Sequence, residues 1–120
     1  MAGTVVTTEE TYGSVKKIKF EWTSSAGGAA DAVTTNAYSG VLERLITIPG
    51  AGGSAPTTLY DVVVNDDAGD ALMGAGANLS ATVTEQVLAS SLGSVANDLL
   101  TLAVTNAGNA KTGTVVIYLR

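Results

Sequence analysis

The sequence contains no histidine and no cysteine, and these two absences remove much of the usual catalytic chemistry. Without imidazole, no side chain with an ordinary pKa exchanges protons near neutral pH, and a Ser–His pair is impossible. Without thiols there is no cysteine nucleophile, no soft zinc ligand and no disulfide framework. We therefore expect a protein that is not an enzyme and that needs no cofactor.

Aromatic and basic side chains are scarce. The 120 residues include four Tyr, one Phe and one Trp, so the core has to be built mostly from Val, Leu and Ile. Acidic residues outnumber basic ones by 11 to 6, which gives a formal net charge of −5. An acidic chain is repelled by nucleic-acid phosphates and by anionic membranes. We therefore expect neither nucleic acid nor a membrane among its partners.

Long apolar runs are also missing. A transmembrane helix needs about 20 apolar residues, and no run approaches that length. The first residues, Met1 to Thr4, lack the basic and apolar segments of a secretory signal. The length fits a single domain spanning residues 1–120. We expect the protein to be made in the cytoplasm and to stay soluble unless it is assembled into a larger particle.

Alternating side chains between Gly- and Ala-rich turns predict an all-β fold. The clearest strand covers residues 15–23, where Ile18, Phe20 and Trp22 share one face and charged side chains occupy the other. Alternation with a period of two residues is typical of a half-buried strand. Trp22 is therefore expected in the core and not on the surface as a sugar-binding platform.

Further strands are predicted from the same pattern. They cover residues 4–8, 33–38, 41–48, 59–65, 71–73, 82–87, 99–106 and 112–119, with hairpin turns at 65–70 and 106–109 and a helical turn after residue 87. About seven or eight short strands are typical of an antiparallel β-sandwich or small barrel. Residues 1–10 form either an edge strand or an extended arm that pairs with a neighbour.

Residues 41–48 carry apolar side chains on both predicted faces, which favours a central strand. Strict alternation places Val41 and Leu45 on one face. It places Leu42, Ile46 and Ile48 on the other.

The acidic turn is the strongest candidate for a metal site. Asp66, Asp67 and Asp70 lie close together in the sequence and offer the oxygen ligands that Ca²⁺ prefers. The turn lacks the bidentate Glu that ends a calcium-binding loop. Asp and Gly are also the ordinary residues of tight turns. We prefer the interpretation as a solvated turn and assign no metal ligand.

Two other features are candidate binding sites. The β-branched segment Thr4, Val5, Val6, Thr7 and Thr8 favours an extended backbone and is a candidate partner-binding edge. Lys17, Lys19 and Glu21 share one strand face, which either meets an acidic partner or prevents aggregation of the strand. We favour the second interpretation.

Catalytic residues are not assigned. The carboxylates of Glu9, Glu10, Glu43 and Glu85 are not placed by the sequence as the opposed pair that glycoside chemistry requires. Ser14 and Lys17 have the spacing of a Ser–Lys pair but lie at the start of a strand rather than on a helix.

Several passages resemble the small virion structural proteins of tailed bacteriophages. They are GSVKKIKFEWTS at residues 13–24, LYDVVVNDDAGD at 59–70, GANLS at 76–80 and NAGNAKTGTVVIYLR at 106–120. The resemblance covers nearly the whole chain, and its motifs are compositional and strand-like. It carries over no functional residue.

The resemblance implies a capsid decoration (cement) protein that binds the outer surface of the major capsid shell and stabilises it. The implied partners are the major capsid protein and further copies of this chain, commonly as a trimer, and the implied location is the capsid surface of the virion. The alternatives are a structural protein of the tail or head–tail junction, and a β-sandwich module that binds a host surface or a carbohydrate.

Overall fold

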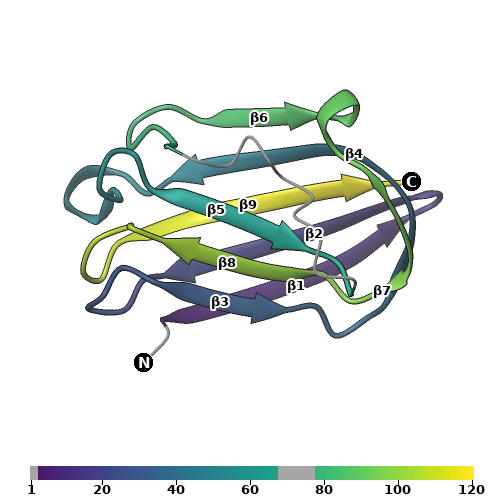
Figure 1. Cartoon of the computed structure of the whole chain (residues 1–120), viewed down its shortest axis with the longest axis horizontal. Coiled ribbons are helices and arrows are strands. Elements are labelled where there is room, and N and C mark those ends of the chain that lie inside the picture. Colours follow the sequence, from purple (N-terminus) through teal and green to yellow (C-terminus); the bar gives the residue numbers. More distant parts are fainter. Residues whose placement is uncertain (1–2, 68–77) are drawn as a thin grey trace.

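The segments with alternating side chains form two antiparallel β-sheets that pack face to face (Figure 1). The structure is a computed structural model, and it describes residues 3–67 and 78–120. The prediction of an all-β fold with antiparallel sheets is confirmed, and the architecture is that of a sandwich. In the described part of the chain, no helix is long and apolar enough to cross a membrane.

The large sheet has the strand order β1-β2-β9-β4-β6, and β7 also pairs with β4. The small sheet has the order β3-β8-β5. The strands of the described residues are β1 (Thr4–Tyr12), β2 (Val15–Thr23), β3 (Ala30–Val33), β4 (Tyr38–Pro49), β5 (Asp61–Asn65), β6 (Glu85–Leu88), β7 (Ser94–Asp98), β8 (Thr101–Thr105) and β9 (Thr112–Leu119). Two short 3-10 turns, η1 (Gly52–Ser54) and η2 (Ala89–Ser91), follow β4 and β6.

Strands β2 and β9 confirm the predicted bounds, and β2 also confirms the predicted face. In β2, Ile18 and Phe20 are fully buried and Trp22 is 2% exposed. The inward side chains of β9 are also fully buried; they are Val115, Ile117 and Leu119. Burying an apolar side chain of this size contributes about 1.5–3 kcal/mol, so these two paired strands form one wall of the core.

The small sheet supplies the opposite wall. Leu102 and Val104 of β8 are fully buried, together with Val62 and Val64 of β5. The two walls meet at an aromatic contact, because the ring of Tyr60, just before β5, lies 5.7 Å from the ring of Trp22 between centroids. The largest side chains of the core therefore join the two sheets.

Two strand predictions are wrong in detail. The predicted strand at 33–38 lies too late, because β3 ends at Val33 and the next residues bend toward β4. The predicted faces of 41–48 are also wrong. A bulge between Leu42 and Arg44 shifts the register, so Leu42 and Leu45 both point inward and Val41 is exposed. An extra residue in a bulge breaks strict alternation.

The predicted hairpin at 106–109 is also wrong, because β8 belongs to the small sheet and β9 to the large sheet. The connection crosses from one sheet to the other.

Strand β7 was not predicted. The predicted strand at 59–65 begins later, at Asp61, and the one at 82–87 becomes β6, followed by the expected helical turn at η2. The predicted strand at 71–73 lies outside the described residues.

Candidate interaction surface

The large sheet turns one side toward the small sheet and the other toward solvent, and we call this second side the outer face. Its side chains stand in rows, because paired strands place residues directly opposite one another. One row crosses β1, β2, β9 and β4 as Val6, Glu21, Thr114 and Ile48. Val6 is 65% exposed and Ile48 is 38% exposed. The row therefore offers apolar side chains to a partner at both of its ends.

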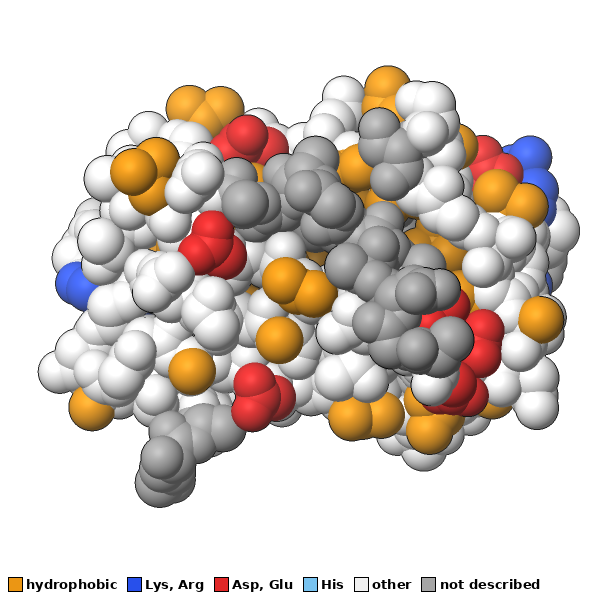
Figure 2. Space-filling model, in the orientation of Figure 1, with side chains coloured by type: hydrophobic (Ala, Val, Ile, Leu, Met, Phe, Trp, Pro, Cys, Tyr) orange, Lys and Arg blue, Asp and Glu red, His pale blue; other side chains and the backbone are white. Residues whose placement is uncertain are grey.

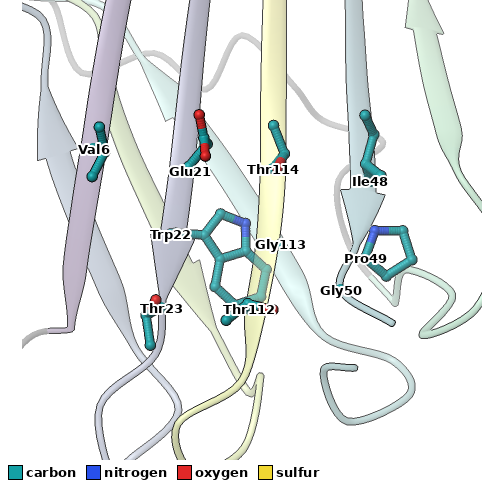
Figure 3. Close-up of a pocket in the computed structure, with 10 residues that line it drawn as sticks. All are labelled: Val6, Glu21, Trp22, Thr23, Ile48, Pro49, Gly50, Thr112, Gly113 and Thr114. Carbon is teal, nitrogen blue, oxygen red and sulfur yellow. The ribbon is translucent and has the colours of Figure 1, made fainter. Parts of the chain in front are cut away.

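An open groove lies along this row, with β9 forming its floor (Figure 3). At Gly113 this floor is the β9 backbone, and Gly113 lies directly opposite Trp22. The indole ring of Trp22 fills the inner side of β9 at this point, and a Cβ on Gly113 would lie 2.3 Å from Cζ2 of the ring. The missing side chain of Gly113 therefore makes room for the indole ring inside the sandwich.

The chemistry of the groove is that of a contact surface. Its one ionisable side chain, Glu21, forms an exposed ion pair with Lys19 at 3.2 Å. The remaining walls are Thr and apolar side chains and backbone. A surface of this kind offers a partner apolar contact from Val6 and Ile48 and hydrogen bonds from the Thr side chains.

The predicted partner-binding segment, residues 4–8, lies in β1 at the edge of the large sheet and pairs with β2 along its whole length. Its side chains divide between two sides. Val5 packs against the core, whereas Val6 is exposed on the outer face. The loop before β3 lies close to the start of β1. The Gly3 amide there donates a hydrogen bond to the Ala29 carbonyl at 3.0 Å.

Further along β1, Glu9 connects the strand to the segment between β3 and β4. One carboxylate oxygen accepts a hydrogen bond from the Thr35 amide at 2.9 Å. The other accepts from the Asn36 amide at 3.1 Å and from the Tyr38 hydroxyl at 2.7 Å. Glu9 therefore holds the edge of the large sheet against the edge of the small one.

The same contacts change the acidity of both partners. Partial burial raises the pKa of Glu9, but the hydrogen bonds from Tyr38, Thr35 and Asn36 outweigh it and hold the pKa below its ordinary value of 4.5. Burial, the hydrogen bond to Glu9 and the negative charge of Glu9 raise the pKa of Tyr38 well above 10. The charged carboxylate and the neutral phenol are thus the favoured forms.

Glu9→Gln is expected to lower the free energy of unfolding at pH 7 by about 1–2 kcal/mol, since it removes charge-assisted hydrogen bonds at a partly exposed site. A carboxylate whose folded pKa is lowered stabilises the fold above its unfolded pKa, and this stabilisation is lost as the pH falls through the folded pKa. Urea unfolding at pH 7 and pH 3 should therefore show a large difference in the free energy of unfolding between the wild type and Glu9→Gln only at pH 7. Glu10→Gln, on the exposed neighbour, is the control. An equal difference at both pH values would contradict the role of the charge.

The acidic side chains of the predicted turn are only partly described, because Asp70 lies outside the described residues. Asp67 accepts a hydrogen bond from the Leu99 amide at 3.0 Å and so ties the end of β5 to the start of β8. Asp66 lies beside it. In residues 3–67 and 78–120, no three acidic side chains are gathered as a metal ion would require.

The other carboxylates are distributed over separate strands. Glu9 and Glu10 are consecutive in β1, Glu43 lies at the bulge of β4, and Glu85 lies on β6, where it accepts a hydrogen bond from the Ser80 amide at 2.6 Å. The structure uses two of them, Glu9 and Glu85, as acceptors of backbone hydrogen bonds. The groove at Gly113 was not predicted, because only the register of β2 against β9 places Trp22 beneath a glycine.

The sequence matches no protein-family model. It also has no significant match among curated proteins.

Proposed function

We propose that this chain is a capsid decoration (cement) protein of a tailed bacteriophage. It binds the outer surface of the major capsid shell and stabilises it, and it acts as a homo-oligomer, commonly a trimer. The resemblance of residues 13–24, 59–70 and 106–120 to small virion proteins supports the proposal. The observation that carries it is the broad outer face, which combines a rigid sheet with the exposed apolar side chains of Val6 and Ile48.

The proposed mechanism is preferential binding to the assembled shell. A protein that binds the assembled shell and not its separate subunits stabilises the shell in proportion to the logarithm of its concentration over the dissociation constant. A rigid sheet of six paired strands suits this role, because little conformational freedom is lost when it docks. Val6 and Ile48 contribute the apolar area, and the polar side chains between them in the same row, Glu21 and Thr114, set the orientation.

The proposal predicts that the purified chain co-sediments with shells that lack it and raises the temperature at which they open. Val6→Asp should weaken this binding by about tenfold or more, because it buries a carboxylate in the contact. Val33→Asp is the matched control, since Val33 is an exposed valine of the small sheet. Thermal melting of both variants checks that they fold.

Two results would contradict the proposal. One is the absence of co-sedimentation with shells when the chain is in excess. The other is binding to purified tails in place of heads, which would favour the tail or head–tail junction.

A further inference from the structure

Strand β1 forms an edge that differs from the other edges of the sandwich. It has nine residues, pairs with β2 without a register shift and contains neither proline nor lysine. The other edge strands, β3, β5, β6 and β7, have only four or five residues each. Short strands, bulges, prolines and lysines are the features that keep an edge from pairing with another chain. Among the described strands, β1 therefore has the longest edge without these features.

Every second residue of β1 turns its backbone N–H and C=O groups away from β2. Tyr12 and Val15 flank the two-residue turn between β1 and β2, so their backbones form a hydrogen-bonded pair. Bonding to β2 then recurs at every second residue of the strand. The Gly3 amide has the phase that this requires, since it donates to Ala29 and not to β2. The outward-facing residues of β1 are Val5, Thr7, Glu9 and Thr11.

These outward backbone groups have no partner among the described residues. The hydrogen bonds outside the β-ladders of this part of the chain use the backbone of none of them. Strand β3 lies close to β1 but pairs with β8 alone. N–H and C=O groups repeated along an open sheet edge are met by another extended backbone, which adds a strand to the sheet. The occupant that fits this edge is therefore a β-strand of another chain.

The charge of β1 lies in its second half and restricts how two copies of the strand can pair. Residues 4–8 have no ionisable side chain, and Glu9 and Glu10 follow them. Antiparallel pairing of two copies about Glu9 or Glu10 would place like charges directly opposite each other, which destabilises a sheet. Pairing about Val6 places Glu9 opposite the uncharged Gly3 and brings no two charges together.

We infer that β1 pairs antiparallel with β1 of a second copy of this chain, about a two-fold axis at Val6. Val6 is 65% exposed, and this register places it directly opposite Val6 of the second copy. Val5 lies opposite Thr7, so their outward groups exchange both hydrogen bonds on each side of the axis. A second copy fits because it presents a free edge of the same length and phase, and a two-fold axis makes that edge complementary to itself.

The inference goes beyond the proposed function, which leaves the contact between copies undefined. Figure 2 shows the small-sheet side, where exposed apolar side chains stand in small separate groups among polar and acidic ones. Such scattered apolar side chains are ordinary on a protein surface, so the contact is better placed at the β1 edge. A two-fold contact joins copies in pairs, and three pairs can close into an assembly of six that keeps the three-fold symmetry of a trimer.

The first test measures self-association of the purified chain. Sedimentation equilibrium from about 10 μM to 1 mM should show pairs, or an even number of copies, in equilibrium with the monomer. Thr7→Pro removes an outward N–H group and no bond to β2, so it should weaken association by about tenfold or more. Thr7→Ser keeps the N–H group and should change the association constant by less than about twofold. Thermal melting checks that both variants fold.

The second test reads the register by cross-linking, which is clean because the chain has no cysteine. Val6→Cys should form a disulfide-linked dimer on mild oxidation, since directly opposite residues lie within disulfide reach. Thr4→Cys and Thr8→Cys should not link to themselves but should link to each other when mixed, because this register places them opposite. Val83→Cys is the control, since Val83 is 59% exposed and lies beside β6 at the opposite edge of the large sheet.

The inference is overturned if the wild-type chain stays monomeric at about 1 mM, if it forms a plain trimer, or if Val83→Cys cross-links as readily as Val6→Cys. If Thr7→Pro does not fold, the cross-linking pattern decides. A chain that binds shells as a monomer would overturn the inference and leave the proposed function standing. A chain that cross-links through Val6→Cys but does not bind shells would support the inference while the proposed function fails.

Discussion

Trp22→Ala is expected to lower the free energy of unfolding by about 3–5 kcal/mol, the range for truncation of a buried aromatic side chain. Trp22 is 2% exposed, and its ring contacts Tyr60 from the facing sheet at 5.7 Å between centroids. The ring also fills the space left by Gly113. Truncation therefore opens a cavity that touches both sheets, and the surrounding backbone cannot close it without moving paired strands.

Urea unfolding followed by circular dichroism measures this effect. Tyr12→Ala is the control, because Tyr12 is an exposed aromatic residue and its truncation should change the stability by less than about 0.5 kcal/mol. A loss below about 1 kcal/mol for Trp22→Ala, in the range of surface substitutions, would mean that the inward face of β2 is assigned wrongly.

Gly113→Ala is the second substitution with a large expected effect. The added Cβ would lie 2.3 Å from Cζ2 and 2.6 Å from Cε2 of Trp22, so either the indole ring or strand β9 has to move. Overpacking of this kind costs about 1–3 kcal/mol and occasionally more. Gly113 does not have a positive φ, so the cost arises from the contact with Trp22 and not from the backbone conformation.

A double-mutant cycle separates this contact from other effects. In a Trp22→Leu background the added methyl group meets a smaller side chain. Gly113→Ala should therefore destabilise this background by about 0.5–3 kcal/mol less than it destabilises the wild type. Gly53→Ala is the control, because a Cβ there meets nothing within 4 Å. Additive effects of Gly113→Ala and Trp22→Leu would contradict the proposed contact.

The fold class and the core strands could be predicted because their side chains alternate without interruption. Residues 15–23 and 112–119 have one apolar and one mostly polar face, and the structure confirms both strands with their bounds. Strand β3 was placed too late, since its inward residues, Ala30 and Ala32, give a weak apolar signal. Strand β7 was missed because Val95 is its one buried side chain and Asn97 has a positive φ.

Other errors arise where the pattern along the chain does not determine the pairing. The bulge at Leu42 inverts the alternation of β4, and no single residue in the sequence marks it. Two alternating segments joined by a short turn favour a hairpin, yet β8 and β9 lie in different sheets. The rows of the outer face depend on register, so the neighbours of Thr114 could not be derived from the sequence.

The order of strands β1, β2 and β9 also determines how the molecule responds to force. β1 and β9 are both antiparallel to β2, so they run in the same direction, and the start of β1 and the end of β9 lie at opposite ends of the sandwich (Figure 1). Tension applied between these two points acts along the strands. The nine residue pairs of the β1–β2 ladder then bear the load together instead of opening one after another. The strand order consequently makes the fold resistant to shear between these two points.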